Sequence, residues 1–167
     1  MISKAHAAYF ARYNRWQNQS HYREAGKLTD AQRRLDRGAH FKSIDGTLNH
    51  ILWADSMWMH RLAKWPAPGA RKMEETPFFH ANFADLTAAR EDHDKRLIAW
   101  TDGLEQAALE GDLTWTSSDG TVTATRPRWL LVTHMFNHET HHRGQVHAML
   151  TAAGCKPDAT DLPWMPE

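Results

Sequence analysis

The chain has 167 residues, enough to bury one sizeable core, and we expect a single domain over residues 1–167. Its 20 basic and 20 acidic side chains leave a formal net charge of zero and form no basic run, which argues against nucleic acid or an anionic membrane as a partner. No apolar stretch has the length of a membrane span and no signal-peptide core follows Met1, so we expect a soluble cytoplasmic protein. Cys155 is the only cysteine, which excludes an internal disulfide.

Capping and breaking residues divide the first half of the chain into helices. Residues 3–24 contain no Gly or Pro and carry apolar residues at helical intervals, which predicts a long helix ending near Gly26. Thr29 suits the cap of one or two further turns that end before Gly38. Ser43 begins a second main helix, which stops at the breaker cluster Trp65-Pro-Ala-Pro-Gly69.

The second half predicts two more helices with a hairpin between them. A third helix is expected over residues 82–106, and its charges between Arg90 and Arg96 are typical of a solvated face. Over residues 113–126 the period changes to two around a Ser-Ser-Asp-Gly turn, which indicates a β-hairpin. Pro127 suits the start of a fourth helix that reaches Gly154. The fold class is therefore all-α, a four-helix bundle with a small β-hairpin before the last helix.

The fourth helix carries a histidine motif that predicts a metal site. His138 and His142 are four residues apart, so both rings project from one helix face, which also carries Leu131 and Met135. Buried imidazoles need partners, and this spacing brings two ring nitrogens to one metal ion. His134, one turn earlier, forms an equally good pair with His138. His134 and His142 are about 12 Å apart along the axis, so all three cannot share an ion.

A third ligand is expected from a facing helix, since bundle metal sites are built across helices. The candidates around the second helix are His40, His50 and His60. His60 lies on the polar arc and is expected to face water, whereas periodicity favours His50, on the flank of the apolar arc. Most of the twelve histidines are expected at the surface, and four that occupy polar surroundings receive no role: His6, His21, His80 and His93.

The segments Leu48-Asn-His50-Ile and Asn137-His138-Glu-Thr-His-His142-Arg-Gly-Gln145 resemble the DinB family of metal-binding four-helix bundles. The resemblance covers the whole chain, including the helix order and the insert before the last helix. It implies a variant up-and-down bundle, often a homodimer. It also implies a divalent ion, zinc or nickel, held by His50, His138 and His142, which leaves His134 out. Some relatives are thiol-dependent transferases or isomerases.

Three neutral nitrogen ligands leave a coordination position open, as in catalytic zinc sites. We therefore expect a metal-dependent enzyme that activates a small thiol or water for transfer to a small electrophilic substrate. Glu139, Asn137 and Gln145 are candidates for orienting the ligands or the nucleophile, and Arg143 for binding a substrate carboxylate or forming a surface ion pair. Asp55, on the inward arc of the second helix, is expected to make a core hydrogen bond or to support a ligand. A non-catalytic, structural metal site is the main alternative.

A second enzyme class also matches the motif. His138-Glu139-Thr-His-His142 fits HExxH, in which two histidines bind zinc and the glutamate is the general base of a hydrolase or protease. That motif usually takes its third ligand downstream. His147 is expected to point to the opposite helix face, and the acidic residues after it lie in a proline-punctuated tail, so a protease is the weaker interpretation.

Overall fold

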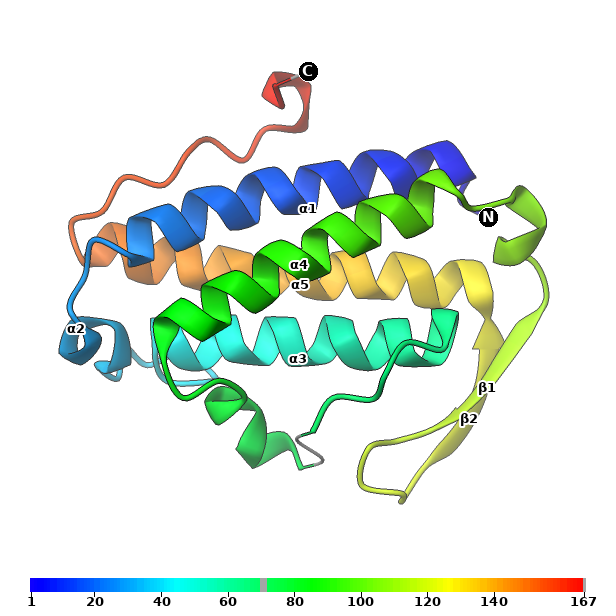
Figure 1. Ribbon diagram of the computed structural model, residues 1–167, viewed down its shortest axis with the longest axis horizontal. Coiled ribbons are helices and arrows are strands. Elements are labelled where there is room, and N and C mark those ends of the chain that lie inside the picture. The colour runs from blue at the N-terminus through cyan, green and yellow to red at the C-terminus, as the bar shows by residue number, and fades with distance from the viewer. Residues whose placement is uncertain (70–71, 167) are drawn as a thin grey trace.

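The structure, a computed structural model, describes residues 1–69 and 72–166. Four long helices pack side by side: α1 (Lys4–Ala25), α3 (Ile44–Ala63), α4 (Phe83–Asp102) and α5 (Arg128–Ala152) (Figure 1). The shorter elements are α2 (Asp30–Arg34), η1 (Met73–Phe78), η2 (Gln106–Leu109), the strands β1 (Asp112–Thr116) and β2 (Thr123–Pro127), and η3 (Leu162–Trp164). The two strands form an antiparallel hairpin directly before α5. This confirms the all-α bundle with a hairpin insert.

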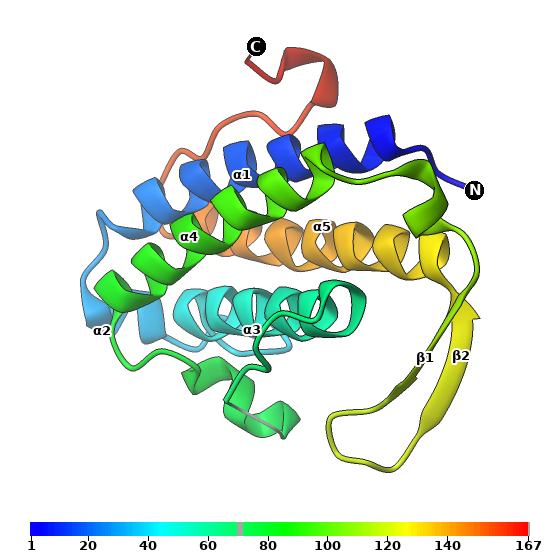
Figure 2. The same cartoon turned by 45° about the vertical axis from the view of Figure 1, so that its right-hand side comes forward.

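The helices do not simply alternate in direction. α3 and α4 run parallel to each other and antiparallel to α1 and α5 (Figures 1 and 2). The connection between α3 and α4, which contains η1, therefore returns along the bundle before α4 begins. In Figure 2 it covers one side of α3. This order brings α5 into contact with both α1 and α3, and it places the histidine motif of α5 against α3.

Local side-chain chemistry fixes the helix starts. The hydroxyl groups of Ser3 and Ser43 and the amide oxygen of Asn82 accept hydrogen bonds from the first turns of α1, α3 and α4. Thr29 forms a capping box with Gln32 at α2. The third long helix is shorter than predicted: it ends at Asp102 before Gly103, and residues 106–109 form a separate 3-10 turn.

The core consists of two apolar clusters with a polar layer between them. One cluster lies toward the hairpin and includes Met59, Leu97 and Met135, and the other lies toward α2 and includes Leu48 and Leu150. Between them the four long helices contribute buried polar or charged side chains: Asn14, Asn18, Asp55, Arg90, Asp94, Glu139 and Arg143. Buried charges need partners, and the ion pairs described below supply them.

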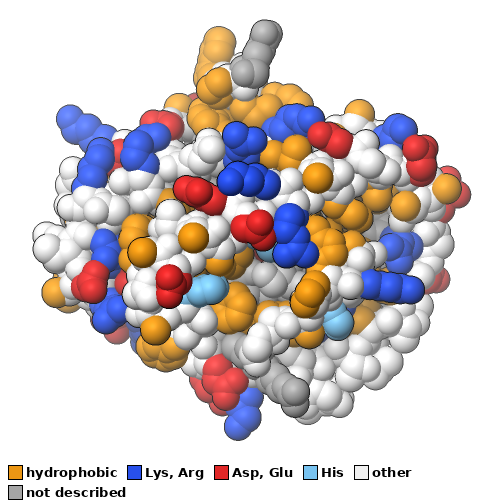
Figure 3. All heavy atoms as spheres, in the orientation of Figure 1, with side chains coloured by type: hydrophobic (Ala, Val, Ile, Leu, Met, Phe, Trp, Pro, Cys, Tyr) orange, Lys and Arg blue, Asp and Glu red, His pale blue; other side chains and the backbone are white. Residues whose placement is uncertain are grey.

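Two sequence expectations about exposure were wrong. Arg90 and Asp94 are buried, so the charged run of α4 is not a solvated face throughout. His21 and His93 are buried as well, at 1% and 5% exposure. On the face shown in Figure 3, basic and acidic side chains are interspersed. Among the described residues, no helix is both long and apolar enough to cross a membrane.

Candidate metal centre

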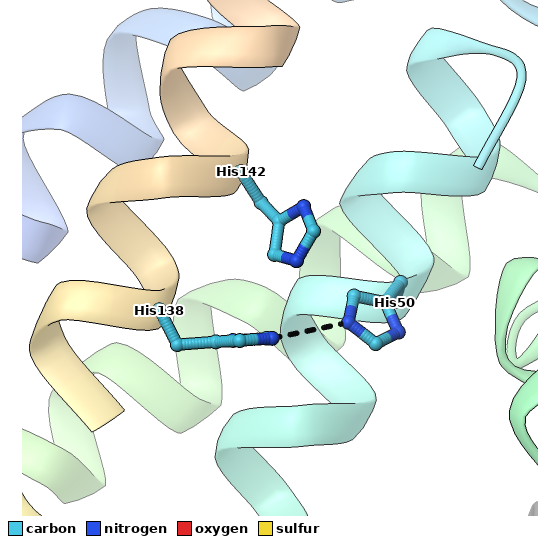
Figure 4. A group of neighbouring side chains, drawn as sticks. All are labelled: His50, His138 and His142. Carbon is cyan, nitrogen blue, oxygen red and sulfur yellow. Dashed lines mark hydrogen bonds between the residues drawn. The ribbon is translucent and has the colours of Figure 1, made fainter. Parts of the chain in front are cut away.

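Three histidines from two helices converge on one point. His138 and His142 extend from α5 toward His50 of α3 (Figure 4). One ring nitrogen from each lies within 4.8 Å of the others. The Nε2 atoms of His50 and His138 are 3.4 Å apart, close to the roughly 3.3 Å that separates two nitrogens on a tetrahedral zinc ion. The geometry fits a divalent ion held by the three rings.

Hydrogen bonds orient two of the three rings. Nδ1 of His50 is 3.0 Å from the Thr76 hydroxyl, which itself donates to the Met73 carbonyl at 2.8 Å. The hydroxyl oxygen therefore accepts the Nδ1 proton of His50. Nδ1 of His142 donates to Oε1 of Gln145 at 2.8 Å. In both rings Nδ1 carries the proton, so the Nε2 lone pair is free for a metal. Metal-binding histidines usually donate their other ring N–H in this way.

Burial keeps these imidazoles neutral. Burial, followed by the charges of neighbouring histidines, lowers the pKa of His50 to about 3 and that of His138 to about 4. The pKa of His142 is also lowered, mainly by burial. Neutral imidazole is the form that binds a metal, so the ligand set is ready at neutral pH.

An aromatic ring covers the cluster from the α2 side. The ring of Phe41 stacks on His50, with centroids 3.7 Å apart, and lies 5.4 Å from His142. Phe41 reaches this position because Gly46 has no side chain: a Cβ there would overlap the Phe41 carbonyl oxygen. Lys42 turns the chain with a positive φ of 68° directly after Phe41.

The other candidate ligands lie outside the cluster. His134 lies one turn before His138, and its ring contacts Trp58 at 5.2 Å. His60 is exposed, as expected, and bonds to the Trp65 carbonyl. His40 is exposed on the loop before Phe41. No fourth His, Cys, Asp or Glu of the described chain joins the three histidines.

The predicted supporting residues divide into two groups. Gln145 orients His142, whereas Asn137 is exposed on α5. Arg143 is neither a surface residue nor open to substrate: it is 3% exposed, donates to Asn14 and lies 3.8 Å from Glu139. Glu139 is fully buried.

A charged network lies behind the metal cluster. Arg90 donates to Asp55 at 2.6 Å and to Asp94 at 2.7 Å, and Glu139 is 3.7 Å from it. Burial, followed by the charge of Asp55, raises the pKa of Glu139 to about 8. The carboxyl groups of Glu139 and Asp55 interact directly, and a protonated Glu139 can donate a hydrogen bond to the Asp55 carboxylate. Asp55 thus makes core hydrogen bonds, as predicted, and is not a member of the histidine cluster.

A cavity of about 230 Å³ opens directly beside the cluster, and His50 and His138 form part of its wall. A larger cavity of about 830 Å³ lies at the first turns of α3, but none of the three histidines lines it. The smaller cavity is therefore the one suited to a ligand of a bound metal. Its walls include Arg61, which the sequence did not single out.

Sequence reasoning also missed Thr76 and Phe41. Both come from connections between helices, where no periodicity shows which side chain turns inward. The only local signals near these two residues are the N-cap Ser43, which follows Phe41, and the 3-10 turn that contains Thr76.

Comparison with known proteins identifies the family of the chain. No curated protein and no solved structure matches the chain. The sequence profile of the DinB family matches residues 1–167. The chain, with its variant four-helix bundle and buried three-histidine cluster, belongs to the DinB family.

Proposed function

We propose that each chain binds one divalent metal ion, zinc or nickel, through His50, His138 and His142, and uses it to activate a small thiol or water toward a small electrophilic substrate. The observation that carries this proposal is the convergence of three neutral imidazoles, without a fourth protein ligand in the described chain, beside a cavity. Three protein ligands with an open position are typical of catalytic zinc sites, whereas structural sites are closed by four.

The chain's own residues hold the ligands and shape the surroundings. Thr76 and Gln145 fix two imidazoles with Nε2 free. When bound, the ion lowers the pKa of a coordinated water or thiol, which supplies a nucleophile at neutral pH. The cavity would admit the second substrate next to the histidines, and Trp53, Trp58 and Trp115 form part of its wall.

Metal content tests the ligand assignment. Elemental analysis of freshly purified protein is expected to give one ion per chain. His142→Ala should lose most of it, while His134→Ala should retain full stoichiometry as the matched control from the same helix face. Loss of metal from His134→Ala with retention in His142→Ala would reject the assignment.

The response of the metal to small thiols tests the proposed activity. In cobalt-substituted protein, a suitable thiol is expected to shift the ligand-field spectrum, and its consumption with an electrophile should require the metal. A spectrum unmoved by thiols, anions or chelating inhibitors would show a closed site and support a structural metal. The hydrolase alternative gains no support from Glu139, whose carboxyl group lies in the charged network with Asp55 and Arg90.

The resemblance and the exposed aromatic side chains also support a homodimer. Phe78 and Trp164 are 79% and 74% exposed, so their side chains are available for contact with a second copy of the chain. Light scattering at micromolar concentration is expected to give twice the chain mass of 19.2 kDa. A mass of one chain would reject the dimer.

A further inference from the structure

The cavity beside the histidines extends along the groove between α3 and α5. His50 and His138 lie at one end, and Arg61 of α3 and Trp115 of the hairpin line it as well. Trp58 packs edge-on against Trp115, with centroids 5.6 Å apart, so aromatic rings form much of the wall between these groups. A ligand in this cavity would meet these aromatic rings, together with the polar side chains of Ser117, Ser118 and His134.

Arg61 brings an unpaired positive charge to this cavity. It is half-buried, and none of the described carboxylates forms an ion pair with it, unlike Arg33, Arg90 and Arg143. Its guanidinium donates to the Thr116 carbonyl at 3.2 Å and lies 4.9 Å from the Trp58 ring. A guanidinium has five donors, so most of them remain available to a ligand. Burial lowers the pKa of Arg61, as expected without an acidic partner.

The helix sets the distance between the two polar ends of the cavity. Arg61 follows His50 by eleven residues on α3. This corresponds to about 16 Å along the axis. The Arg61 side chain leans back over Trp58, one turn nearer to His50. The guanidinium is therefore about 12 Å from the histidines along the helix axis.

We propose that this cavity selects an elongated thiol with a carboxylate at its far end, with the sulfur directed to the three histidines and the carboxylate bound by Arg61. This inference rests on the proposed function, and it names the chemical class of the thiol. Arg61 would thereby bind the substrate carboxylate, the role that the sequence suggested for Arg143. Arg143 is instead buried in the charged network. A planar guanidinium binds a carboxylate through two parallel hydrogen bonds, and partial burial strengthens them.

Calorimetric titration of zinc-loaded protein with paired thiols tests the inference. The pairs are ω-mercaptoalkanoic acids and ω-mercaptoalkanols of equal length, so only the end charge differs. In the wild type, acids of roughly six to eight carbons, long enough to span the groove, should bind about tenfold more tightly than their alcohols. In Arg61→Gln this preference should fall to less than about twofold, while the alcohols bind as before.

Arg96→Gln is the matched control. Arg96 also lies over a tryptophan, 4.0 Å from the Trp65 ring, but it does not line the cavity. The acid preference should survive this change. Equal binding of acid and alcohol to the wild type, or a preference that persists in Arg61→Gln, would overturn the inference and leave the proposed function standing. Absence of binding by every thiol would reject both.

Discussion

At the scale of single residues, the Thr76 hydroxyl decides which nitrogen of His50 faces the metal position. It accepts the Nδ1 proton and in turn donates to the Met73 carbonyl. Thr76→Val keeps the shape of the side chain but removes this acceptor. We expect metal affinity to fall about 10- to 100-fold, the usual effect of losing such a partner, with stoichiometry restored at saturating metal.

Competition with a chromogenic chelator measures this affinity directly. Thr76→Ser retains the hydroxyl and should bind metal within about threefold of the wild type. An unchanged affinity in Thr76→Val would show that the hydrogen bond does not orient the ligand.

Glu139 illustrates how burial sets a charge state. Arg90 and Arg143 face three buried carboxyl groups, those of Asp55, Asp94 and Glu139. Two positive charges balance two carboxylates, so the third carboxyl group carries a proton. Glu139 carries this proton because its pKa is raised to about 8. Glu139→Gln preserves the donor to Asp55, so the free energy of unfolding at pH 7 should change by less than about 1 kcal/mol. Asp55→Asn, which unbalances Arg90, should cost about 3–5 kcal/mol.

The pH dependence of stability separates Glu139→Gln from the wild type. Because folding raises the pKa of Glu139 from 4.5 to about 8, its contribution is complete below pH 4.5 and is lost as the pH rises toward 8. The free energy of unfolding of the wild type should therefore fall as the pH rises toward 8, and that of Glu139→Gln should fall less. Urea unfolding of metal-free protein at pH 6, 7 and 8 measures the difference, and parallel curves would contradict the assignment.

At the scale of elements, the loop before α3 is held against its first turn by the absence of a side chain at Gly46. Gly46→Ala would push the Phe41 carbonyl away and displace the ring stacked on His50. We expect a loss of about 1–3 kcal/mol in the free energy of unfolding, typical of overpacking, together with weaker metal binding.

Gly144→Ala is the matched control, because Gly144 lies within α5 and an added Cβ meets nothing within 4 Å. Replacing this helical glycine should stabilise the protein by up to about 1 kcal/mol without changing metal affinity. If both variants behave alike, the contact between Gly46 and Phe41 does not support the site.

Helix starts and the hairpin could be predicted because they depend on local chemistry. Ser43 and Thr29 cap α3 and α2, and the hairpin turns at Gly120, which has a φ of 75°. The burial of Arg90 and Asp94 was missed because a run of charges usually indicates solvent. Their spacing from Leu86 and Leu97 gave the contrary signal, since all four lie on one face of α4 and that face is buried.

At the scale of the whole molecule, the candidate site combines segments that no local pattern connects. The spacing of His138 and His142 predicts that they share a face, and the family resemblance adds His50. Arg61 and Thr76 become visible only when α3, η1 and the hairpin are assembled around the groove, because their surroundings come from distant parts of the chain. Periodicity reports which side of a helix is buried, but it does not report what lies opposite.

The buried histidines make the stability of the metal-free protein sensitive to acid. Burial holds the pKa of His21 at about 3 and that of His93 well below its ordinary value of 6.5, and the three cluster histidines behave alike. Each is neutral when folded but takes up a proton on unfolding below pH 6.5. Stability from a lowered histidine pKa is present above 6.5 and is lost as the pH falls toward 3. Four acids with raised pKa values, Asp45, Asp55, Asp94 and Glu139, oppose this loss. The histidines with lowered pKa values, which also include His80 and His134, outnumber them.

We therefore expect the free energy of unfolding to be greatest near neutral pH and to fall steeply between pH 6.5 and 4. His21 provides the cleanest test, because it lies outside the metal cluster and neither ring nitrogen has a hydrogen-bond partner in the described chain. His21→Phe keeps a ring against His147 but cannot take up a proton. Between pH 6.5 and 4.5 the free energy of unfolding of the variant should fall by about 1.4 kcal/mol less per pH unit than that of the wild type, which corresponds to one proton. Urea unfolding at pH 4.5, 5.5 and 6.5 measures this slope, and an acid limb identical to that of the wild type would show that His21 is charged in the folded protein.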